Sequence, residues 1–243
     1  MDWHRRYLQQ AAWTRDLRLY LFEHAGLKKA LRVLEIGCGT GAVLADLDTP
    51  ASIFGLDVDF LRLVGAKSHV PAAVLTCGNA LGLPYSPGVF DLTFCHFLLL
   101  WVGDPLQALR EMKRVTRPGG SVLALAEPDY NSRLDEPQTL AQLGCLQAES
   151  LQRQGADTGL GARLAVLFNE AGIQLIETGP LTMGLEHPPS TAERDLEWEV
   201  LESDLEGRVP ARDIRRLKRT DERAWEKGGR VLHVPTYFAW GNA

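Results

Sequence analysis

The chain has 243 residues, of which 45% are hydrophobic and 23% charged, and its formal net charge is −5. A chain of this length buries a core large enough to fold without disulfides or a structural metal. Its negative charge disfavours a polyanionic partner such as nucleic acid. The cysteines form no C-x-x-C pair, and the basic start has no apolar segment behind it. We therefore expect a soluble, cytoplasmic protein without a membrane partner.

Residues 3–28 carry aromatic and apolar side chains at helical spacing, which predicts one or two helices that stop near Gly26. The pattern then changes to short apolar segments that alternate with helical ones. This alternation is typical of a parallel sheet covered on both faces. The expected strands are Arg32–Ile36, Ser52–Leu56, Ala72–Thr76, Phe90–Cys95 and Ser121–Ala126.

The helix before the last of these strands has clear boundaries. Asp104 is a good N-cap, Pro105 suits the first helical position, and apolar residues then line one face. Residues 118–120, Pro-Gly-Gly, are expected to end the helix and turn the chain into the next strand.

Further elements follow in the C-terminal part of the chain. A helix at about Gly161–Glu170 leads into a strand at Ile173–Glu177, and a last strand covers Val231–Trp240 with a bulge or break at Pro235. Residues 182–229 interrupt this pattern with an acidic first half and a basic second half. We interpret them as an inserted helical lid.

A glycine-rich turn, GCGTG over residues 37–41, follows the first strand directly, and a helix is expected after it. Glycines let the backbone turn tightly and approach a bound ligand closely. The loop also satisfies the dinucleotide fingerprint, so by itself it does not separate a nicotinamide cofactor from another nucleoside. Glu35, two residues before the loop, suits a cationic ligand better than a pyrophosphate. Asp57 ends the next strand, where a carboxylate can accept both ribose hydroxyls.

Five pieces of the sequence, in this order, resemble the class I S-adenosylmethionine-dependent methyltransferases. They are the glycine loop with Glu35, Asp57, and residues 78–80, 90–92 and 117–120. The chain is most similar to the type 11-like, small-molecule branch that includes quinone-biosynthesis methyltransferases, and the resemblance is strong over residues 30–127.

The resemblance implies a Rossmann-like, doubly wound α/β fold with a seven-stranded sheet whose last strand is antiparallel. N-terminal helices and the inserted lid would complete a single domain over residues 1–243. Its cofactor-binding core would span about 30–127, and substrate or lid elements would span about 1–28, 128–165 and 182–229.

The resemblance also assigns contacts with S-adenosylmethionine. The glycine loop would pass beneath the methionine part of the cofactor, with Glu35 near its amino group, and Asp57 would hold the ribose. Asn79 would face the adenine; the family often has Asp there, and Asn still accepts through its carbonyl oxygen. The expected cofactor-binding set is Glu35, Gly37, Cys38, Gly39, Gly41, Asp57, Val58, Asn79, Ala80, His96 and Phe97.

Methyl transfer from a sulfonium is an in-line displacement that needs a positioned acceptor and a dry site. A general base is needed only where the acceptor loses a proton. His96, Glu127 and Asp129 are candidate bases because they follow strands at the edge where ligands bind. Each has a structural alternative, a core or capping histidine in the first case and an acidic loop that caps a helix in the others. No metal is expected.

Contacts with the acceptor are expected from elements outside the core. Trp3, Tyr7 and Trp13 of the N-terminal segment and Tyr130 after the fifth strand are the candidates, with Tyr20 as a further one. Aromatic residues at helical spacing also pack simply onto a sheet, so this alternative stays open.

Three other functions remain at this point. The basic run Arg212–Arg223 would suit a methyltransferase that acts on RNA or protein, although it can equally pair with the acidic helix before it. Because the glycine loop also satisfies the dinucleotide fingerprint, an NAD-dependent oxidoreductase is a second alternative. A non-catalytic binding module could also retain this fold. The preferred hypothesis is transfer of a methyl group to a small molecule that the sequence does not identify.

Overall fold

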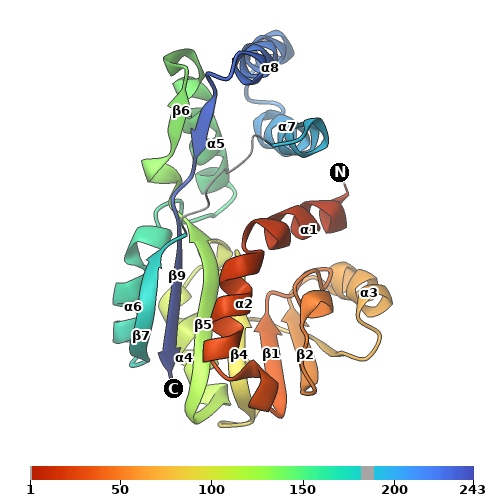
Figure 1. The fold of residues 1–243 in the computed structure, drawn as a ribbon, viewed down its shortest axis with the longest axis vertical. Coiled ribbons are helices and arrows are strands. Elements are labelled where there is room, and N and C mark those ends of the chain that lie inside the picture. The colour runs from red at the N-terminus through yellow and green to blue at the C-terminus, as the bar shows by residue number, and fades with distance from the viewer. Residues whose placement is uncertain (1, 182–188) are drawn as a thin grey trace.

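The computed structural model describes residues 2–181 and 189–243. Seven strands form one sheet in the order β3-β2-β1-β4-β5-β9-β7, and β9 runs antiparallel to both of its neighbours (Figure 1). This arrangement confirms the expected doubly wound sheet with an antiparallel last strand. The strands are β1 (Arg32–Ile36), β2 (Ser52–Asp57), β3 (Val74–Cys77), β4 (Phe90–Cys95), β5 (Thr116–Pro128), β7 (Gln174–Pro180) and β9 (Thr236–Asn242).

Helices cover both faces of the sheet. Neighbouring residues of a strand point to opposite faces, so that Val33 packs with the α2 and α3 side and Leu34 with the α4 and α6 side. The predicted N-terminal helical segment forms two helices, and Gly26 after them has a φ of +79°. The helices of this part are α1 (Trp3–Trp13), α2 (Arg15–His24), α3 (Phe60–His69), α4 (Pro105–Val115) and α6 (Leu164–Glu170).

The start of α4 is as predicted, but its end is not. The Asp104 carboxylate accepts the Gln107 N–H at 2.9 Å, as an N-cap does. The helix ends at Val115, and Pro118-Gly119-Gly120 lies inside β5 rather than at the helix end. Thr116 begins β5 by pairing with Phe90, so strand pairing ends the helix before the glycines are reached.

Other expected boundaries hold within a few residues. The strand expected at Ala72–Thr76 begins at Val74. The last apolar stretch breaks at Pro235, as predicted, into β8 (Val231–His233) and β9. A proline there cannot donate to a ladder, so the chain leaves one sheet and joins the other.

A second group of elements, which we call the cap, lies beyond the carboxyl ends of the parallel strands (Figure 1). The expected lid is helical where the structure describes it, and residues 182–188 of that expectation lie outside the described residues. The cap has a small core of its own, to which Leu143, Trp198 and Leu217 contribute. Its elements are α5 (Ala141–Arg153), α7 (Thr191–Leu205), α8 (Ala211–Glu226), β6 (Leu134–Glu136) and β8.

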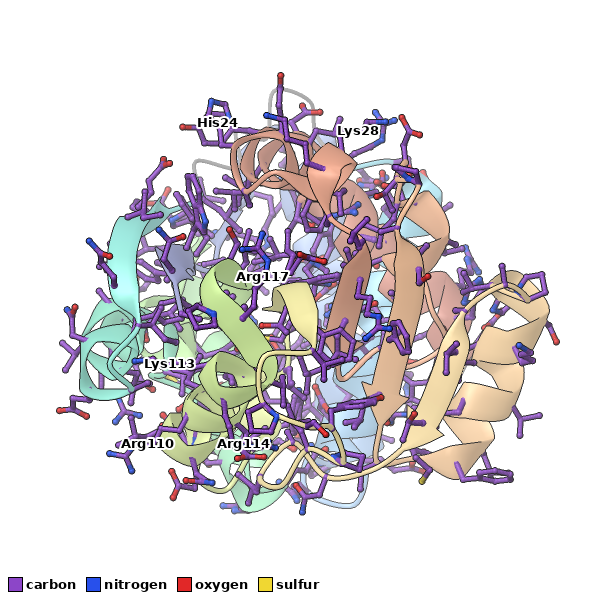
Figure 2. The ribbon with its side chains drawn as sticks, turned by 90° about the horizontal axis from the view of Figure 1, so that it is seen from below. His24, Lys28, Arg110, Lys113, Arg114 and Arg117 are labelled. Atoms are coloured by element: carbon purple, nitrogen blue, oxygen red, sulfur yellow. The ribbon has the colours of Figure 1, made fainter. Side chains whose placement is uncertain are left out.

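Basic side chains of α4 and of the segments around it gather at the opposite end of the sheet (Figure 2). Arg114 pairs with Glu111 at 2.7 Å, and Arg117 pairs with Asp91 at the same distance. These arginines are neutralised locally and lie at the amino ends of the strands, away from the edge where ligands bind in open α/β sheets.

Candidate active site

The glycine loop forms a tight turn at the carboxyl end of β1. Gly37, Gly39 and Gly41 have φ angles of +74°, +52° and +80°, a region that side chains disfavour. The N–H groups of Gly37 and Cys38 donate to the carbonyl of Leu56, at 2.7 and 3.0 Å. The loop is therefore folded back against the end of β2.

The helix expected after this loop is absent. Residues 42–51, all described, contain only a three-residue 3₁₀ turn, Leu44–Asp46. About ten residues lead from the loop to the start of β2, and the backbone is already extended at Leu47, directly after the 3₁₀ turn. The loop is therefore not followed by the dipole of an α-helix, and its N–H groups at Gly37, Cys38, Gly39 and Gly41 already donate within the protein.

Asp57 is buried at the end of β2 and is held in place by the backbone. Its Oδ2 accepts the Gly39 N–H at 2.7 Å, and its Oδ1 accepts the Asp59 N–H at 2.9 Å. A carboxylate has about four acceptor positions, so two remain for hydroxyl donors. The geometry fixes this carboxylate beside the glycine loop.

Glu35 is buried behind the same loop, with 2% of its surface exposed. Its Oε2 has no hydrogen-bond partner among the described residues. Burial raises the pKa of this carboxyl to about 8, which Arg18 opposes and Asp57 reinforces. A buried carboxyl oxygen without a donor is costly, so this position suits a ligand that brings a positively charged N–H group. The residues at the loop therefore fit the amino-acid part of S-adenosylmethionine.

Helix α1 covers the glycine loop. A Cβ atom at Gly39 would lie 3.0 Å from the Tyr7 ring, which shows how closely that ring rests on the loop. His4 Nδ1 lies 2.8 Å from the Thr40 hydroxyl, and Trp3 lies 6.0 Å from Tyr7 between ring centroids. Trp3 and Tyr7, which the sequence suggests as acceptor contacts, therefore lie over the glycine loop, where the cofactor is expected.

Val58, Asn79 and Ala80 lie at the carboxyl ends of β2 and β3. The Gly78 N–H donates to the Asp57 carbonyl at 3.0 Å, which joins the two strand ends. Asn79 Oδ1 already accepts the Leu81 N–H at 2.9 Å. The oxygen expected to face adenine is therefore partly engaged within the turn, and one of its two acceptor positions and the side-chain NH₂ of Asn79 remain for a ligand.

His96 joins the end of β4 to the junction of α1 and α2. Its Nε2 lies 2.9 Å from the Thr14 hydroxyl, which also accepts from Arg18 at 3.2 Å. Burial, followed by the charge of Arg18, lowers the pKa of His96 to about 3. A histidine this weakly basic stays neutral at physiological pH, so these contacts favour the structural alternative. Phe97, next to it, has a φ of +51°.

Glu127 and Asp129 both accept backbone N–H groups of short helical turns. The buried Glu127 carboxylate accepts from Leu98, Leu99 and Leu100 at 2.9–3.1 Å, and burial raises its pKa to about 7 against these three bonds. Asp129 accepts the Asn131 N–H at 3.1 Å. These contacts are those of carboxylates that cap short helical turns, which is the structural alternative to a role as catalytic base.

A cavity of about 860 Å³ opens between α1, the carboxyl ends of β4 and β5, and the cap. Three of the residues singled out in the sequence meet in its lining: Trp13, Phe97 and Tyr130. Its size suits a small organic molecule. Tyr20 is not in the lining; its hydroxyl donates to Glu177 at 3.1 Å.

Sequence reasoning missed the cap residues of this cavity and its arginines, among them Arg6. Trp198 and Trp225 come from α7 and α8, and the nearly buried Arg6 comes from α1. An aromatic residue on each lid helix was the available signal, but its inward direction depends on how α7 and α8 pack.

The described residues contain no group of three or more His, Cys, Asp or Glu side chains that could hold a metal ion. All four cysteines are free thiols, with Cys38 and Cys95 buried. Within the described ranges, no helix combines the length and apolar character that crossing a membrane requires.

Comparisons with known proteins bear on this geometry. A family model described as a methyltransferase domain matches residues 34–124. The demethylmenaquinone methyltransferase of Bacillus mycoides (strain KBAB4) is 30% identical over 182 residues, which cover 65% of this chain and 76% of that protein. The malonyl-acyl-carrier-protein O-methyltransferase of Erwinia pyrifoliae is 35% identical over 120 residues, 49% of this chain and 46% of that protein.

Among solved structures, the 4+2 cyclase SpnF aligns with a TM-score of 0.60 and 19% identity, over 93% of this chain and 80% of that one. At this identity the likeness describes the fold alone. The similarity in sequence says more about the family, because the region that the family model matches contains the glycine loop, Asp57 and the strand ends around them. The chain belongs to the class I S-adenosylmethionine-dependent methyltransferases.

Proposed function

We propose that this methyltransferase binds S-adenosylmethionine along the carboxyl ends of β1 to β3 and methylates a small molecule held in the cavity beneath the cap. The observation that carries the proposal is the buried, unpartnered oxygen of Glu35 beside a glycine loop whose backbone is tied to Asp57. Together they provide an acceptor for an ammonium group and one for ribose hydroxyls within one turn.

The cofactor supplies an activated methyl group on a sulfonium centre. The chain supplies position. Glu35 would accept a hydrogen bond from the amino group of the cofactor. The backbone of residues 37–41 would lie along the methionine part of the cofactor. Asp57 would accept the ribose hydroxyls, and Val58, Asn79 and Ala80 would border the adenine. Tyr7 and Leu98 would have to shift, because the Tyr7 ring rests on Gly39 and Leu98 lies 2.6 Å from a Cβ placed at Gly37.

Positioning and exclusion of water are the main contributions of the acceptor site, and positioning alone can supply roughly 7–11 kcal/mol of a barrier. Trp13, Phe97 and Tyr130 would hold the acceptor. For His96, Glu127 and Asp129 we propose structural roles, since each is engaged by a hydroxyl or by backbone N–H groups. A base, where the acceptor needs one, would come from the cavity lining.

An RNA or protein acceptor has less support. In the basic run of α8, Lys218 pairs with Glu202 of α7 at 3.0 Å, and Arg216 lies 3.4 Å from Asp213 of its own helix. The first contact matches electrostatic pairing with the acidic helix, and the second compensates a basic residue within α8 itself. The free thiols support a reducing, cytoplasmic setting as part of the same proposal.

Titration of the purified protein with S-adenosylhomocysteine, and separately with NAD, tests the cofactor assignment by calorimetry. Saturable binding of S-adenosylhomocysteine without binding of NAD is the expected result. Binding of NAD alone would replace the proposal with the oxidoreductase alternative, and binding of neither compound would remove its basis.

A further inference from the structure

The acceptor cavity contains one nearly buried cation that is only partly engaged. Arg6 extends from α1 with 6% of its surface exposed, and its guanidinium lies 4.9 Å from the centre of the Trp13 ring. Nη1 donates to Glu197 Oε2 at 2.5 Å and to Gln9 Oε1 at 2.7 Å. Nε and Nη2 have no hydrogen-bond partner among the described residues, neither atom is fully buried, and Arg6 is part of the cavity lining. One edge of the guanidinium therefore offers N–H donors to a ligand.

From this geometry we propose that the acceptor is an uncharged, ring-bearing molecule with a carbonyl-type or hydroxyl oxygen that accepts hydrogen bonds from Arg6. The inference rests on the proposed function, because it names the class of molecule that the same cavity takes.

The charge balance around Arg6 argues for an uncharged molecule. Glu197 already neutralises Arg6. The two other buried arginines of the lining are also committed. Arg133 pairs with Asp135 at 2.7 Å, and Arg230 pairs with Asp135 and Asp221 at 2.6 and 2.5 Å. An anionic acceptor would thus be buried without a spare cation, which is costly.

The carboxylates nearer the opening strengthen this argument. Asp16 and Glu193 are exposed members of the lining, Glu177 is half-buried, and Arg194 is the cation beside them. Their summed charge is negative and would disfavour the approach of an anion. What the cavity offers instead is donors whose charge is already compensated, and these suit a neutral oxygen.

The aromatic lining argues for a ring. Trp13, Phe97 and Tyr130 come from the α1 and sheet side of the cavity, and Trp198 and Trp225 come from the cap. Aromatic side chains on both sides of the cavity favour a ligand that itself carries an aromatic or unsaturated ring. The Tyr130 hydroxyl has no hydrogen-bond partner among the described residues, and burial raises its pKa to about 12, so that it stays protonated and can act as a second donor.

A matched pair of probes separates the two charge states. Cinnamamide and cinnamate have the same shape, and only the second carries a negative charge. Their binding can be followed by calorimetry and by quenching of tryptophan fluorescence, with and without S-adenosylhomocysteine. We expect the wild-type protein to bind cinnamamide at least about tenfold more tightly than cinnamate, the ratio that corresponds to 1.4 kcal/mol.

Two variants test the role of the ion pair. Arg6→Met should weaken cinnamamide binding about tenfold, whereas Arg5→Met, on the exposed side of the same helix, should not change it. Glu197→Gln leaves the Arg6 charge uncompensated and should shift the preference toward cinnamate, whereas Glu199→Gln removes an equal charge from an exposed position of α7 without this effect.

Equal or tighter binding of cinnamate by the wild-type protein, or no measurable binding of cinnamamide, would overturn the inference. An unchanged preference in Glu197→Gln would do so as well, provided that its circular dichroism spectrum matches that of the wild type. Binding of S-adenosylhomocysteine is read in the same samples. If the wild-type protein binds cinnamamide as expected but does not bind S-adenosylhomocysteine, the result would count against the proposed function and not against the inference.

Discussion

The Gly39 N–H donates to Asp57 Oδ2 at 2.7 Å, so that the glycine loop after β1 and the carboxylate at the end of β2 form a single unit. The two residues that a nucleoside would contact are thereby fixed relative to each other by a hydrogen bond within the protein. A change at either residue should consequently disturb both the loop and the ribose position.

We expect Asp57→Ala to weaken binding of S-adenosylhomocysteine by about 10–100-fold, because it removes acceptors from donors that would be buried with the ligand. Asp48→Ala, which removes a carboxylate from the exposed loop before β2, is the matched control. Calorimetry measures both. Wild-type affinity in Asp57→Ala would refute the ribose assignment.

Glu35→Gln should raise the thermal stability of the ligand-free protein above pH 5. The pKa of Glu35 is about 8 in the folded chain against 4.5 ordinarily, so the folded state binds more protons in this window. Its contribution to stability is therefore complete below about pH 4.5 and is lost as the pH rises through about 8. At pH 8 the variant should melt at least about 2–4 °C higher, the shift that 1 kcal/mol gives in a domain of this size.

The same substitution should weaken binding of S-adenosylhomocysteine, because an amide replaces the carboxylate that would accept its ammonium group. Glu199→Gln, at an exposed position, controls for the loss of one charge. Identical slopes of melting temperature against pH in wild type and Glu35→Gln would show that Glu35 does not titrate in this range.

His96 and Thr14 should be coupled in stability. Their 2.9 Å contact joins β4 to the α1–α2 junction, and the substitutions His96→Ala and Thr14→Ala each remove the same contact. Contacting residues show interaction energies of about 0.5–3 kcal/mol in a double-mutant cycle. Denaturant unfolding of the wild type, both single variants and the double variant measures this energy, and strictly additive effects would contradict the structural role given to His96.

Gly39→Ala should destabilise the chain by about 1–3 kcal/mol and reduce binding of S-adenosylhomocysteine. The φ of +52° is strained for alanine, and the added Cβ would lie 3.0 Å from the Tyr7 ring. Gly103→Ala is the control, since a Cβ there meets nothing within 4 Å. When Gly39→Ala is combined with Tyr7→Ser, the destabilisation caused by the contact between the Cβ and the Tyr7 ring should disappear. The destabilisation caused by the positive φ of the alanine should remain. A Gly39→Ala melting temperature equal to that of Gly103→Ala would contradict this account.

The sequence by itself determined the elements whose signals are local. Apolar runs of strand length marked β1, β2 and β4, Asp104 with Pro105 marked the start of α4, and Pro235 marked a break. The positions of Glu35, the glycines and Asp57 at strand ends also followed, because the carboxyl ends of parallel strands meet at one edge.

Only the tertiary structure decided how distant segments meet at that edge. It separated Tyr7, which rests on the glycine loop, from Trp13, which lines the cavity, although both lie on α1. It assigned Glu127 to three backbone N–H groups and Arg6 to a carboxylate 191 residues away. Such pairings depend on the angle at which helices cross the sheet and on which buried polar groups need partners. These properties arise from packing of the whole chain, and no local propensity encodes them.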